Sequence, residues 1–532
     1  MTDRYRVLLA DTISAEGLQP LLTDPRFEVF EKTGLKGEEL AQAIKGMDAV
    51  VVRSSTRITR AAMAHADRLK VIGRAGVGVD NIDVEAATER GVAVLNAPAG
   101  NTISAAELAF ALLLALVRSV PRADQSMKEG AWDRKSFNGT ELYGKTLSLI
   151  GAGRIGGEVA RRARVFGMRV IAYDPFLAAD RAAALEIELT TLTDALRRGD
   201  VISVHVPLTE ATAGLIGEPE LALLKPGAYL INAARGGVVD EAALYDALVG
   251  KRLAGAALDV YEQEPLPADN PLRKLPNIVL TPHLGAATAE AQQNVALEIA
   301  EAVRAALCEG DLSRAVNAPA LSGEAMRKVR PLLNLSERLG LLASCVGECA
   351  VERVEVRYAG SLEEAVRPIA SAALIGILTP VVGKSAVNFV NAIHLAESRG
   401  IGVDRARVAA HGDYAEFIEL RVHGQSADTV VAGALLAEGH PRIVRINGFH
   451  VDVNPRGTLV VIRNRDVPGV IGRVGTVLGD AGINIAEYHQ ARLKAGGQAL
   501  AAISIDSRLS PGVLERLREL PEIIDVKQAD LD

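Results

Sequence analysis

The stretch "LSLIGAGRIGGEVARRARVFGMRVIAYDP", residues 147–175, carries the strongest structural signal in the chain. An apolar run leads into a glycine-rich turn, an amphipathic segment follows, and a second apolar run ends in an acidic residue. Gly151, Gly153 and Gly156 have the spacing G-x-G-x-x-G, and Asp174 lies 23 residues after the first glycine. The hexapeptide alone is a weak signal, but between a strand and a helix it is typical of a βαβ unit that binds a dinucleotide.

Each residue type in this stretch suits that ligand. The first glycine permits a tight turn, the second lets the backbone approach a pyrophosphate, and the third lets the helix pack on the strand. The helix N-terminus offers free N–H groups and partial positive charge to phosphates. Asp174 would accept hydrogen bonds from the ribose hydroxyls and repel a 2′-phosphate, which favours NAD over NADP. Arg154 is expected over the pyrophosphate or, alternatively, in solvent as an ordinary helix residue. A glycine-rich turn without any ligand is the alternative for the whole stretch.

Apolar runs on both sides of this stretch alternate with amphipathic segments. Four come before it ("YRVLLA", "DAVVVRS", "LKVIGRAG", "VAVLNAP"), and six begin at Lys145 ("KTLSLIG", "RVIAYD", "DVISVHVP", "AYLINAA", "GAALDV", "NIVLTP"). Such alternation is typical of parallel sheets built from βαβ units. The sequence therefore predicts two Rossmann-like, doubly wound α/β domains, with a long helix over Ser104–Val120 between them. The helix that follows Pro282 is expected to return to the first domain, which makes that domain discontinuous.

Beyond Pro319 the pattern changes to α+β, without a phosphate-binding glycine signature. The last part of the chain predicts a βαββαβ module of the ferredoxin-like kind. The expected domains are a discontinuous one over 1–98 and 282–316, a dinucleotide-binding one over 99–281, an α+β one over 320–452 and the ferredoxin-like module over 457–532.

Composition narrows the class of protein. The 532 residues are 49% hydrophobic and 23% charged, with a net charge of −7 and no block of Lys or Arg, which argues against a nucleic-acid partner. Three cysteines indicate a reduced compartment, and Cys345 and Cys349 are expected to be ordinary helix residues. The longest apolar run, 108–117, is about half of what a membrane helix needs, so the sequence predicts a cytoplasmic protein without a membrane segment.

Three strand ends carry the candidate catalytic side chains. His283 follows the last predicted strand in "VLTPHLGAAT", Arg235 lies at a glycine-rich turn in "LINAARGGVVDE", and Glu264 follows a strand in "ALDVYEQEPLP". Because ligands of open α/β sheets bind beyond the carboxyl ends of the strands, the three are expected to meet in one crevice. Histidine is suited to proton transfer near neutral pH, arginine to holding a carboxylate, and glutamate to orienting the imidazole. His205 is expected only to pack or hydrogen-bond beside this sheet. No metal is expected, since further zinc ligands are lacking nearby.

These motifs resemble the D-isomer-specific 2-hydroxyacid dehydrogenases. The resemblance rests on "GAGRIGGEVARRARVFGMRVIAYDP", "NAARGGVVDEAALYDAL", "ALDVYEQEP" and "TPHLGAAT", and on "GRAGVGVDNID" and "NAPAGNTISAAELAFALLLALVR" in the N-terminal half. The C-terminal 200 or so residues are similar to the long-form phosphoglycerate dehydrogenases of that family, which carry an intervening allosteric domain and a terminal ACT domain. The resemblance covers essentially the whole chain.

The resemblance implies NAD-dependent oxidation of 3-phospho-D-glycerate to 3-phosphohydroxypyruvate, the first step of L-serine biosynthesis. It implies that His283 is the general acid/base, that Glu264 is its partner and that Arg235 binds the substrate carboxylate. Further cofactor contacts implied by the family pattern are Ile155, Pro207, Ala233, Asp259 and Gly285, with Asp259 orienting the nicotinamide amide.

The substrate phosphate needs cations, and the resemblance suggests where they lie. Arg53 and Arg74 end two strands of the first domain, although each could be a plain surface arginine. Asn101 is a further expected substrate contact. Arg134 is expected to reach the cleft of a neighbouring subunit, and a solvated charge is the alternative.

The ACT module resembles a serine sensor in which paired modules bind the effector at their shared edge. The corresponding positions are Asn464, Asp466 and Asn484, and Asn464 stands where His or Tyr is usual. Alternatively, Asp466 caps a helix and Asn484 lies in a turn. Paired modules imply at least a dimer, and a homotetramer is expected. Two other functions remain open: a dehydrogenase for another D-2-hydroxy acid, and a non-catalytic NAD(H)-sensing regulatory scaffold.

Overall fold

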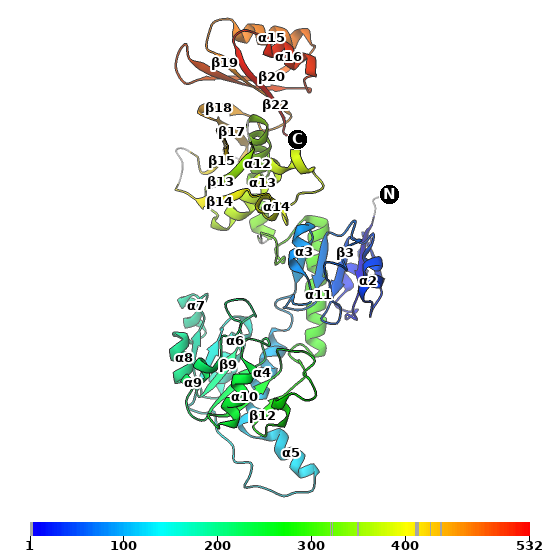
Figure 1. Ribbon diagram of the computed structural model, residues 1–532, viewed down its shortest axis with the longest axis vertical. Helices are drawn as coiled ribbons and strands as arrows, with labels where there is room; N and C mark the ends of the chain where they lie inside the picture. Colours follow the sequence, from blue (N-terminus) through cyan, green and yellow to red (C-terminus); the bar gives the residue numbers. More distant parts are fainter. Residues whose placement is uncertain are drawn as a thin grey trace.

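A computed structural model describes residues 4–319, 321, 323–347, 350–409, 414–425, 427–436 and 439–532. The interpretation of Cys349 as a helix residue lies outside these residues. Four sheets lie along an elongated molecule, with the first in the chain between the second and the third (Figure 1). We call each sheet with its helices a unit and number the four units in chain order; the domain boundaries given above stay a prediction.

The first unit contains a five-stranded parallel sheet in the order β2-β1-β3-β4-β5. Its strands are β1 Tyr5–Leu9, β2 Phe27–Glu31, β3 Ala49–Val52, β4 Val71–Arg74 and β5 Ala93–Asn96. Helices α2 (Gly37–Ile44) and α3 (Val84–Glu89) share an apolar core with one face, and α1 (Gln19–Leu22) and α11 (Ala289–Glu309) with the other. A helix from far along the chain therefore completes this unit. The sequence pattern does not predict β2, because this five-residue edge strand contains two glutamates and lacks a continuous apolar run.

The second unit contains a seven-stranded parallel sheet in the order β12-β11-β10-β9-β6-β7-β8. Its strands are β6 Thr146–Ile150, β7 Arg169–Tyr173, β8 Glu188–Leu189, β9 Val201–Val204, β10 Ala228–Asn232, β11 Leu253–Leu258 and β12 Ile278–Leu280. Its helices are α4 Thr102–Val117, α5 Val120–Lys128, α6 Arg154–Val165, α7 Ala179–Ala184, α8 Leu192–Arg198, α9 Glu218–Leu223, α10 Glu241–Val249 and the 3-10 turn η1 Pro271–Lys274. The short β8 is not predicted by the sequence pattern.

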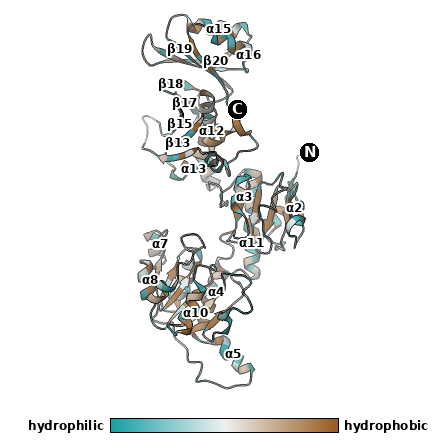
Figure 2. Ribbon diagram, viewed as in Figure 1, coloured by the Kyte–Doolittle hydropathy of each residue, from teal (hydrophilic) through white to brown (hydrophobic). Residues whose placement is uncertain are grey.

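The prediction of one helix over Ser104–Val120 is wrong at the C-terminal end of that range. Helix α4 ends at Val117, Ser119 has a left-handed backbone with φ of 51°, and α5 starts again beyond it at an angle of 63°. Pro121 explains the break, since proline lacks the N–H that a continuing helix would need. None of the described residues of α5 is buried, and Figure 2 shows this helix as mostly hydrophilic where it extends from the second unit.

The third unit has a six-stranded sheet in the order β14-β13-β15-β16-β17-β18. Its elements are α12 Gly323–Val346, β13 Val351–Ala359, η2 Glu363–Ala365, α13 Val366–Val382, α14 Ala392–Glu397, β14 Gly402–Arg407, β15 Glu416–Gly424, β16 Asp428–Leu435, β17 Pro441–Ile446 and β18 Phe449–Val453. By length and composition the segment Glu363–Val382 is apolar enough to cross a membrane, but 67% of its most apolar 18-residue window is buried inside the protein, as in the core helix of a folded unit.

The fourth unit has the expected βαββαβ order, and its antiparallel sheet runs β20-β21-β19-β22. Its elements are β19 Thr458–Arg465, α15 Val470–Asp480, β20 Ile485–Arg492, β21 Gln498–Ile505, α16 Pro511–Arg518 and β22 Ile523–Asp530. One sheet face packs on α15 and α16, and the other joins the core of the third unit. The third unit in turn contacts the first, where Asn388 Nδ2 donates to the Gly91 carbonyl at 2.9 Å.

Candidate active site

Three neighbouring strands of the second sheet end beside one another and carry the predicted catalytic residues. Arg235 follows β10, Glu264 follows β11 and His283 follows β12, and these strands are adjacent in the sheet. The structure thus brings the three residues to one rim, as parallel strands require.

His283 and Glu264 form a direct pair. His283 Nδ1 donates to Glu264 Oε2 at 2.7 Å, which leaves Nε2 as the nitrogen that can meet a substrate hydroxyl. The backbone of His283 is left-handed with φ of 53°, a conformation that few residues other than glycine adopt and that is concentrated at functional sites. Burial tends to raise the pKa of Glu264, but the hydrogen bonds from His283 and from the Tyr261 N–H outweigh it and lower that pKa. Glu264 is therefore an ionised partner for the imidazole.

Asp259 fixes the turn that carries His283. This fully buried carboxylate accepts hydrogen bonds from Thr281 Oγ1 at 2.6 Å, Leu284 N at 2.7 Å and Gly285 N at 2.9 Å. Burial raises its pKa, while the bonds it accepts oppose that effect. The His283 N–H also donates to the Asp259 carbonyl. Asp259 therefore holds the 281–285 turn in addition to lying near the expected cofactor site.

Arg235 lies on a turn in which the next position, 236, must be glycine. A Cβ on Gly236 would lie 1.8 Å from the Tyr261 carbonyl oxygen, so the 235–236 turn packs directly on the backbone beyond β11. Arg235 Nη1 donates to the Ala234 carbonyl at 2.7 Å, and Asn232 Nδ2 donates to the Arg235 carbonyl at 2.9 Å. The guanidinium is thus held at the rim.

The first unit contributes further guanidinium groups close to Arg235. Arg53 follows β3 and Arg74 ends β4. Burial, and then repulsion by the charges of Arg235 and Arg53, lowers the pKa of Arg74 to about 10. Arg74 Nε is buried without a hydrogen-bond partner among the described residues. A cluster of like charges with an unpaired buried N–H group is suited to receive an anion.

The other two predicted substrate residues differ in their placement. Asn101 precedes α4, and its Oδ1 is buried with no partner in the described part of the chain, so its amide is available to a ligand. Arg134 is exposed in the loop after α5, and that loop lies on the side of the second unit away from the first unit (Figure 1). Within one chain the structure does not bring Arg134 to the arginine cluster.

The dinucleotide loop has the shape that the sequence predicts. Gly151 is left-handed with φ of 92°, and a Cβ there would lie 2.7 Å from the His205 carbonyl oxygen. A Cβ on Gly156 would lie 2.3 Å from the Gly151 carbonyl oxygen, so α6 packs tightly on the turn. By contrast, no atom of the described residues lies within 4 Å of a Cβ on Gly153. That open space at the N-terminus of α6 is where a pyrophosphate would lie.

Side chains around the loop agree with this ligand. Asp174 follows β7 and accepts from the N–H groups of Ala152 and Phe176, each at 2.9 Å, which fixes its carboxylate beside the loop. Arg154 is exposed at the start of α6. Ile155 lies beside it, and Pro207 and Ala233 follow β9 and β10 at the same rim. The residues present therefore fit a dinucleotide.

His205 packs against the dinucleotide loop at Gly151 and is not part of the His283–Glu264 pair. Its Nε2 lies 2.8 Å from Ser203 Oγ, and burial lowers its pKa to about 4. The imidazole is therefore neutral at physiological pH. The expectation that His205 packs and hydrogen-bonds beside the sheet is confirmed.

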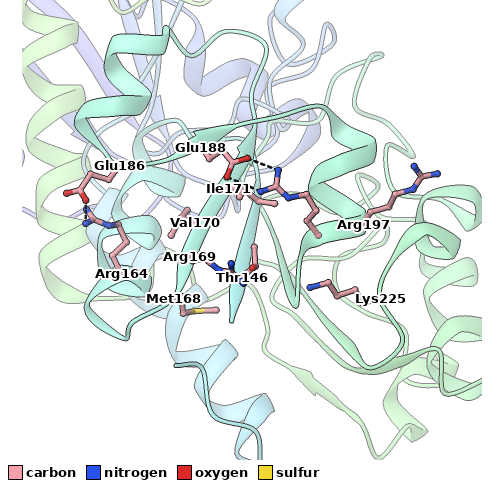
Figure 3. Close-up of a pocket in the computed structure, with 11 residues that line it drawn as sticks. Thr146, Arg164, Met168, Arg169, Val170, Ile171, Glu186, Glu188, Arg197 and Lys225 are labelled. Carbon is pink, nitrogen blue, oxygen red and sulfur yellow. Dashed lines mark hydrogen bonds and ion pairs between the residues drawn. The ribbon is translucent and has the colours of Figure 1, made fainter. Parts of the chain in front are cut away.

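One hollow of the second unit lies at the amino-terminal end of its parallel strands, opposite the rim that carries the catalytic residues. Its volume is about 570 Å³, and Thr146 and Arg169, the first residues of β6 and β7, line it (Figure 3). Arg164 pairs with Glu186 there, and Arg198 pairs with Glu188. These cations lie in the C-terminal turns of α6 and α8, where positive charge stabilises a helix. We therefore assign this hollow no catalytic role.

The three predicted effector residues do not form one site within a chain. Asn464 lies in β19 and is buried, and its Nδ2 donates to the Arg465 carbonyl at 2.8 Å. Asp466 accepts from Gly496 N at 3.0 Å, whereas Asn484 Nδ2 donates to Asp506 Oδ2 at 2.8 Å. Strand register places Asp466 and Asn484 at opposite ends of the sheet, because Arg465 pairs with Gln498 and Ile485 with Ile505.

Metal ligands are not gathered anywhere in the described part of the chain: no group of three or more His, Cys, Asp or Glu side chains is placed to hold an ion. The described cysteines, Cys308 and Cys345, are both unpaired.

Family models match three of the four units: the second, the third and the fourth. Residues 110–285 match the family model described as D-isomer specific 2-hydroxyacid dehydrogenase, NAD binding domain. Residues 328–447 match the D-3-phosphoglycerate dehydrogenase intervening domain, and residues 458–522 match the ACT domain. The fold and the order of the units therefore agree with a single known architecture.

Curated relatives match over the full length. The D-3-phosphoglycerate dehydrogenase of Bacillus subtilis (strain 168) is 42% identical over 528 residues, 99% of this chain and 100% of the relative. That of Methanocaldococcus jannaschii is 42% identical over 529 residues, with the same coverage. Among solved structures, TT0316 protein from Thermus thermophilus has a TM-score of 0.53 and 39% identity over 57% of this chain and 97% of its own. D-lactate dehydrogenase from Aquifex aeolicus, complexed with NAD and lactic acid, has a TM-score of 0.51 and 31% identity over 58% and 97%.

Proposed function

The chain belongs to the D-isomer specific 2-hydroxyacid dehydrogenase family, as a D-3-phosphoglycerate dehydrogenase with intervening and ACT domains, and on that premise we propose how its own residues perform the reaction. It is an NAD-dependent enzyme that oxidises 3-phospho-D-glycerate to 3-phosphohydroxypyruvate at the start of L-serine biosynthesis. The observation that carries the proposal is the His283–Glu264 pair beside Arg235, at the strand ends next to the dinucleotide loop.

Substrate binding depends on charge and orientation. Arg235 binds the C1 carboxylate through its planar group of N–H donors, and Asn101 supplies an amide on the same side. Arg53 and Arg74 bind the phosphate, which relieves the repulsion among the arginines of the cluster. An unphosphorylated acid would leave that repulsion in place, so the cluster favours the phosphorylated substrate.

Proton transfer is the task of His283. Its Nε2 takes the proton of the C2 hydroxyl as the C2–H bond breaks, and Glu264 stabilises the imidazolium through Nδ1. NAD⁺, when bound, supplies the acceptor for the hydride that leaves C2. The products are 3-phosphohydroxypyruvate, NADH and one proton, which His283 releases to solvent from its exposed edge.

Cofactor binding uses the loop after β6. Backbone N–H groups at Gly153 and at the start of α6 would hold the pyrophosphate, with Arg154 and Ile155 beside it. Asp174 would accept the ribose hydroxyls, which selects NAD against NADP. Pro207 and Ala233 would line the remaining path along the rim, and the buried Asp259 and Gly285 would hold the turn beside it.

A substrate assay separates this function from its alternatives. We expect NADH to form with 3-phospho-D-glycerate at a kcat/KM at least about tenfold above that with D-lactate or D-glycerate, since a charged hydrogen bond contributes about 1.5–3 kcal/mol. The Arg74→Ala variant should lose most of that preference. Equal rates on all three acids would favour the general 2-hydroxyacid dehydrogenase, and no turnover at all would favour a regulatory scaffold.

The ACT unit is proposed to bind L-serine between two chains. Asp466 carries charge for an ammonium group and Asn484 an amide for a carboxylate, but they lie at opposite ends of one sheet. If two sheets pair antiparallel along their β20 edges, Asp466 of each chain comes near Asn484 of the other. Asn464, buried in β19, would then shape the floor of the site. Such pairing requires at least a dimer, and we propose a homotetramer that works in the cytoplasm.

Mixed oligomers test this arrangement. Asp466→Ala and Asn484→Ala should each raise the half-inhibitory serine concentration by about 10- to 100-fold, because each removes a hydrogen bond to a charged group. Oligomers assembled from both variants should regain part of the wild-type inhibition, because half of the paired sites in a mixed pair are intact. If the mixed oligomers stay as insensitive as their parents, the shared site is refuted.

A further inference from the structure

The acidic side chain of Asp80 lies close to Arg235 and Arg74. Its Oδ2 is 3.4 Å from Nε of Arg235. Asp80 belongs to the loop after β4 in the first unit, and Arg235 belongs to the turn after β10 in the second. The ion pair therefore joins the two α/β units across the cleft that is proposed to receive the substrate.

The loop that carries Asp80 is held rigidly by its own unit. Asn96 Nδ2 donates to the Val77 carbonyl at 2.7 Å. Asn81 Nδ2 donates to the carbonyls of Arg53 at 2.7 Å and Thr56 at 2.6 Å. The backbone on both sides of Asp80 is therefore fixed to neighbouring strand ends, and the carboxylate is presented from a preorganised loop.

The same loop is shaped to accept the Arg235 side chain. A Cβ on Gly78 would lie 2.2 Å from Arg235 Nη2 and 2.5 Å from Asp80 Oδ2. The guanidinium thus lies directly over the backbone at Gly78, where any larger residue would displace it. With Nε facing Asp80 and Nη1 donating to the Ala234 carbonyl, the N–H groups on Nη2 and the second one on Nη1 remain for a ligand.

We propose that Asp80 is a positioning residue for the oxidation, an assignment that rests on the proposed function: from the opposite unit it orients the Arg235 guanidinium so that its remaining N–H groups meet the substrate carboxylate. Asp80 does not touch the reacting carbon. Its contribution is to place a flexible arginine side chain within the narrow range of positions that C1 and C2 require.

Orientation and simple electrostatics predict opposite effects on binding. Removing the Asp80 charge takes away one of the acids near Arg74 and Arg235, which on charge alone strengthens the binding of an anionic substrate. Losing the orientation of Arg235 instead slows the chemical step. A positioning role therefore predicts a lower kcat without weaker substrate binding. The Asp80 side chain is 65% exposed, so its loss should leave Tm nearly unchanged.

The experiment compares Asp80→Asn and Asp80→Glu with Asp24→Asn, which removes the acid of another aspartate–arginine pair, with Arg26, in the same unit. We expect kcat of Asp80→Asn to fall about 10- to 100-fold, as a small misplacement of a binding group does. The Kd of 3-phospho-D-glycerate, measured with NADH bound, should not increase, and Asp80→Glu should recover most of the lost rate. Asp24→Asn should match wild type.

A second variant tests whether the orientation of Arg235, and not another consequence of changing Asp80, sets the rate. Gly78→Ala leaves Asp80 in place but puts a methyl group where Nη2 lies, and it should lower kcat in the same way. A kcat of Asp80→Asn within twofold of wild type, or an equal loss in Asp80→Asn and Asp80→Glu together with weaker substrate binding, would overturn the positioning role alone. Absence of turnover in the wild-type enzyme would instead overturn the proposed function.

Discussion

Replacing His283 by alanine is expected to lower kcat by about 10³-fold, within the range of about 10²- to 10⁴-fold that a positioned general base contributes. The imidazole is the group whose Nε2 can take the C2 hydroxyl proton while Nδ1 is held by Glu264. Alanine removes both the proton acceptor and the charge that Glu264 stabilises. Stopped-flow measurement of NADH formation, at saturating 3-phospho-D-glycerate and NAD⁺, gives the loss directly.

The chain offers a matched control for this variant. His65 Nε2 lies 3.4 Å from Glu38 Oε1 on the surface of the first unit, so His65→Ala breaks a histidine–glutamate pair outside the cleft. We expect His65→Ala to keep wild-type kcat, and His283→Ala to keep the wild-type Kd for NADH. A His283→Ala enzyme that retains more than about a tenth of the wild-type kcat would show that another group accepts the proton.

Replacing Arg235 by lysine is expected to lower kcat/KM by about 10²-fold, although the positive charge is kept. Lysine cannot hold a carboxylate through two parallel N–H donors, and loss of one charged hydrogen bond costs about 1.5–3 kcal/mol. The substitution also breaks the contacts of Nη1 with the Ala234 carbonyl and of Nε with Asp80. Initial rates over a range of 3-phospho-D-glycerate concentrations separate the effects on kcat and KM.

Arg273→Lys is the comparison for this experiment. Arg273 donates to the carbonyls of Pro267 and Leu266 in the same unit, at 2.9 and 2.8 Å, and is exposed. Its exchange should change kcat/KM less than about twofold, because an exposed lysine can still donate to one of these carbonyls and neither carbonyl contacts His283. If Arg235→Lys is as active as Arg273→Lys, the guanidinium does not bind the carboxylate in the manner described.

Local spacing explains which features the sequence predicts well. The glycine loop and Asp174 follow from a pattern within a single βαβ unit, where chain geometry leaves little freedom. Arg235, Glu264 and His283 are far apart in sequence, yet each follows a strand, and the parallel sheet brings their strand ends together. Periodicity is enough for both inferences.

Contacts between units cannot be predicted from the periodicity of the sequence. The Asp80–Arg235 pair joins two sheets whose relative placement no periodicity specifies. The acid in "GVGVDNID" follows a strand end, and this is the signal that could have drawn attention to it. Asn464 is similar: its sequence position suggests an exposed turn, but β19 continues through it and buries the side chain. The break at Ser119 could have been predicted from Pro121, because proline is favoured in the first turn of a new helix and disfavoured inside a continuing one.

The most informative single measurement is a crystal structure of the enzyme with NADH and 3-phospho-D-glycerate, a combination that cannot react. We expect the C2 hydroxyl oxygen within about 3.2 Å of His283 Nε2, which is the reach of a hydrogen bond. The carboxylate should lie on the Arg235 guanidinium and the phosphate between Arg53 and Arg74. A C2 hydroxyl turned away from His283, with the carboxylate held by other residues, would refute the proposed mechanism.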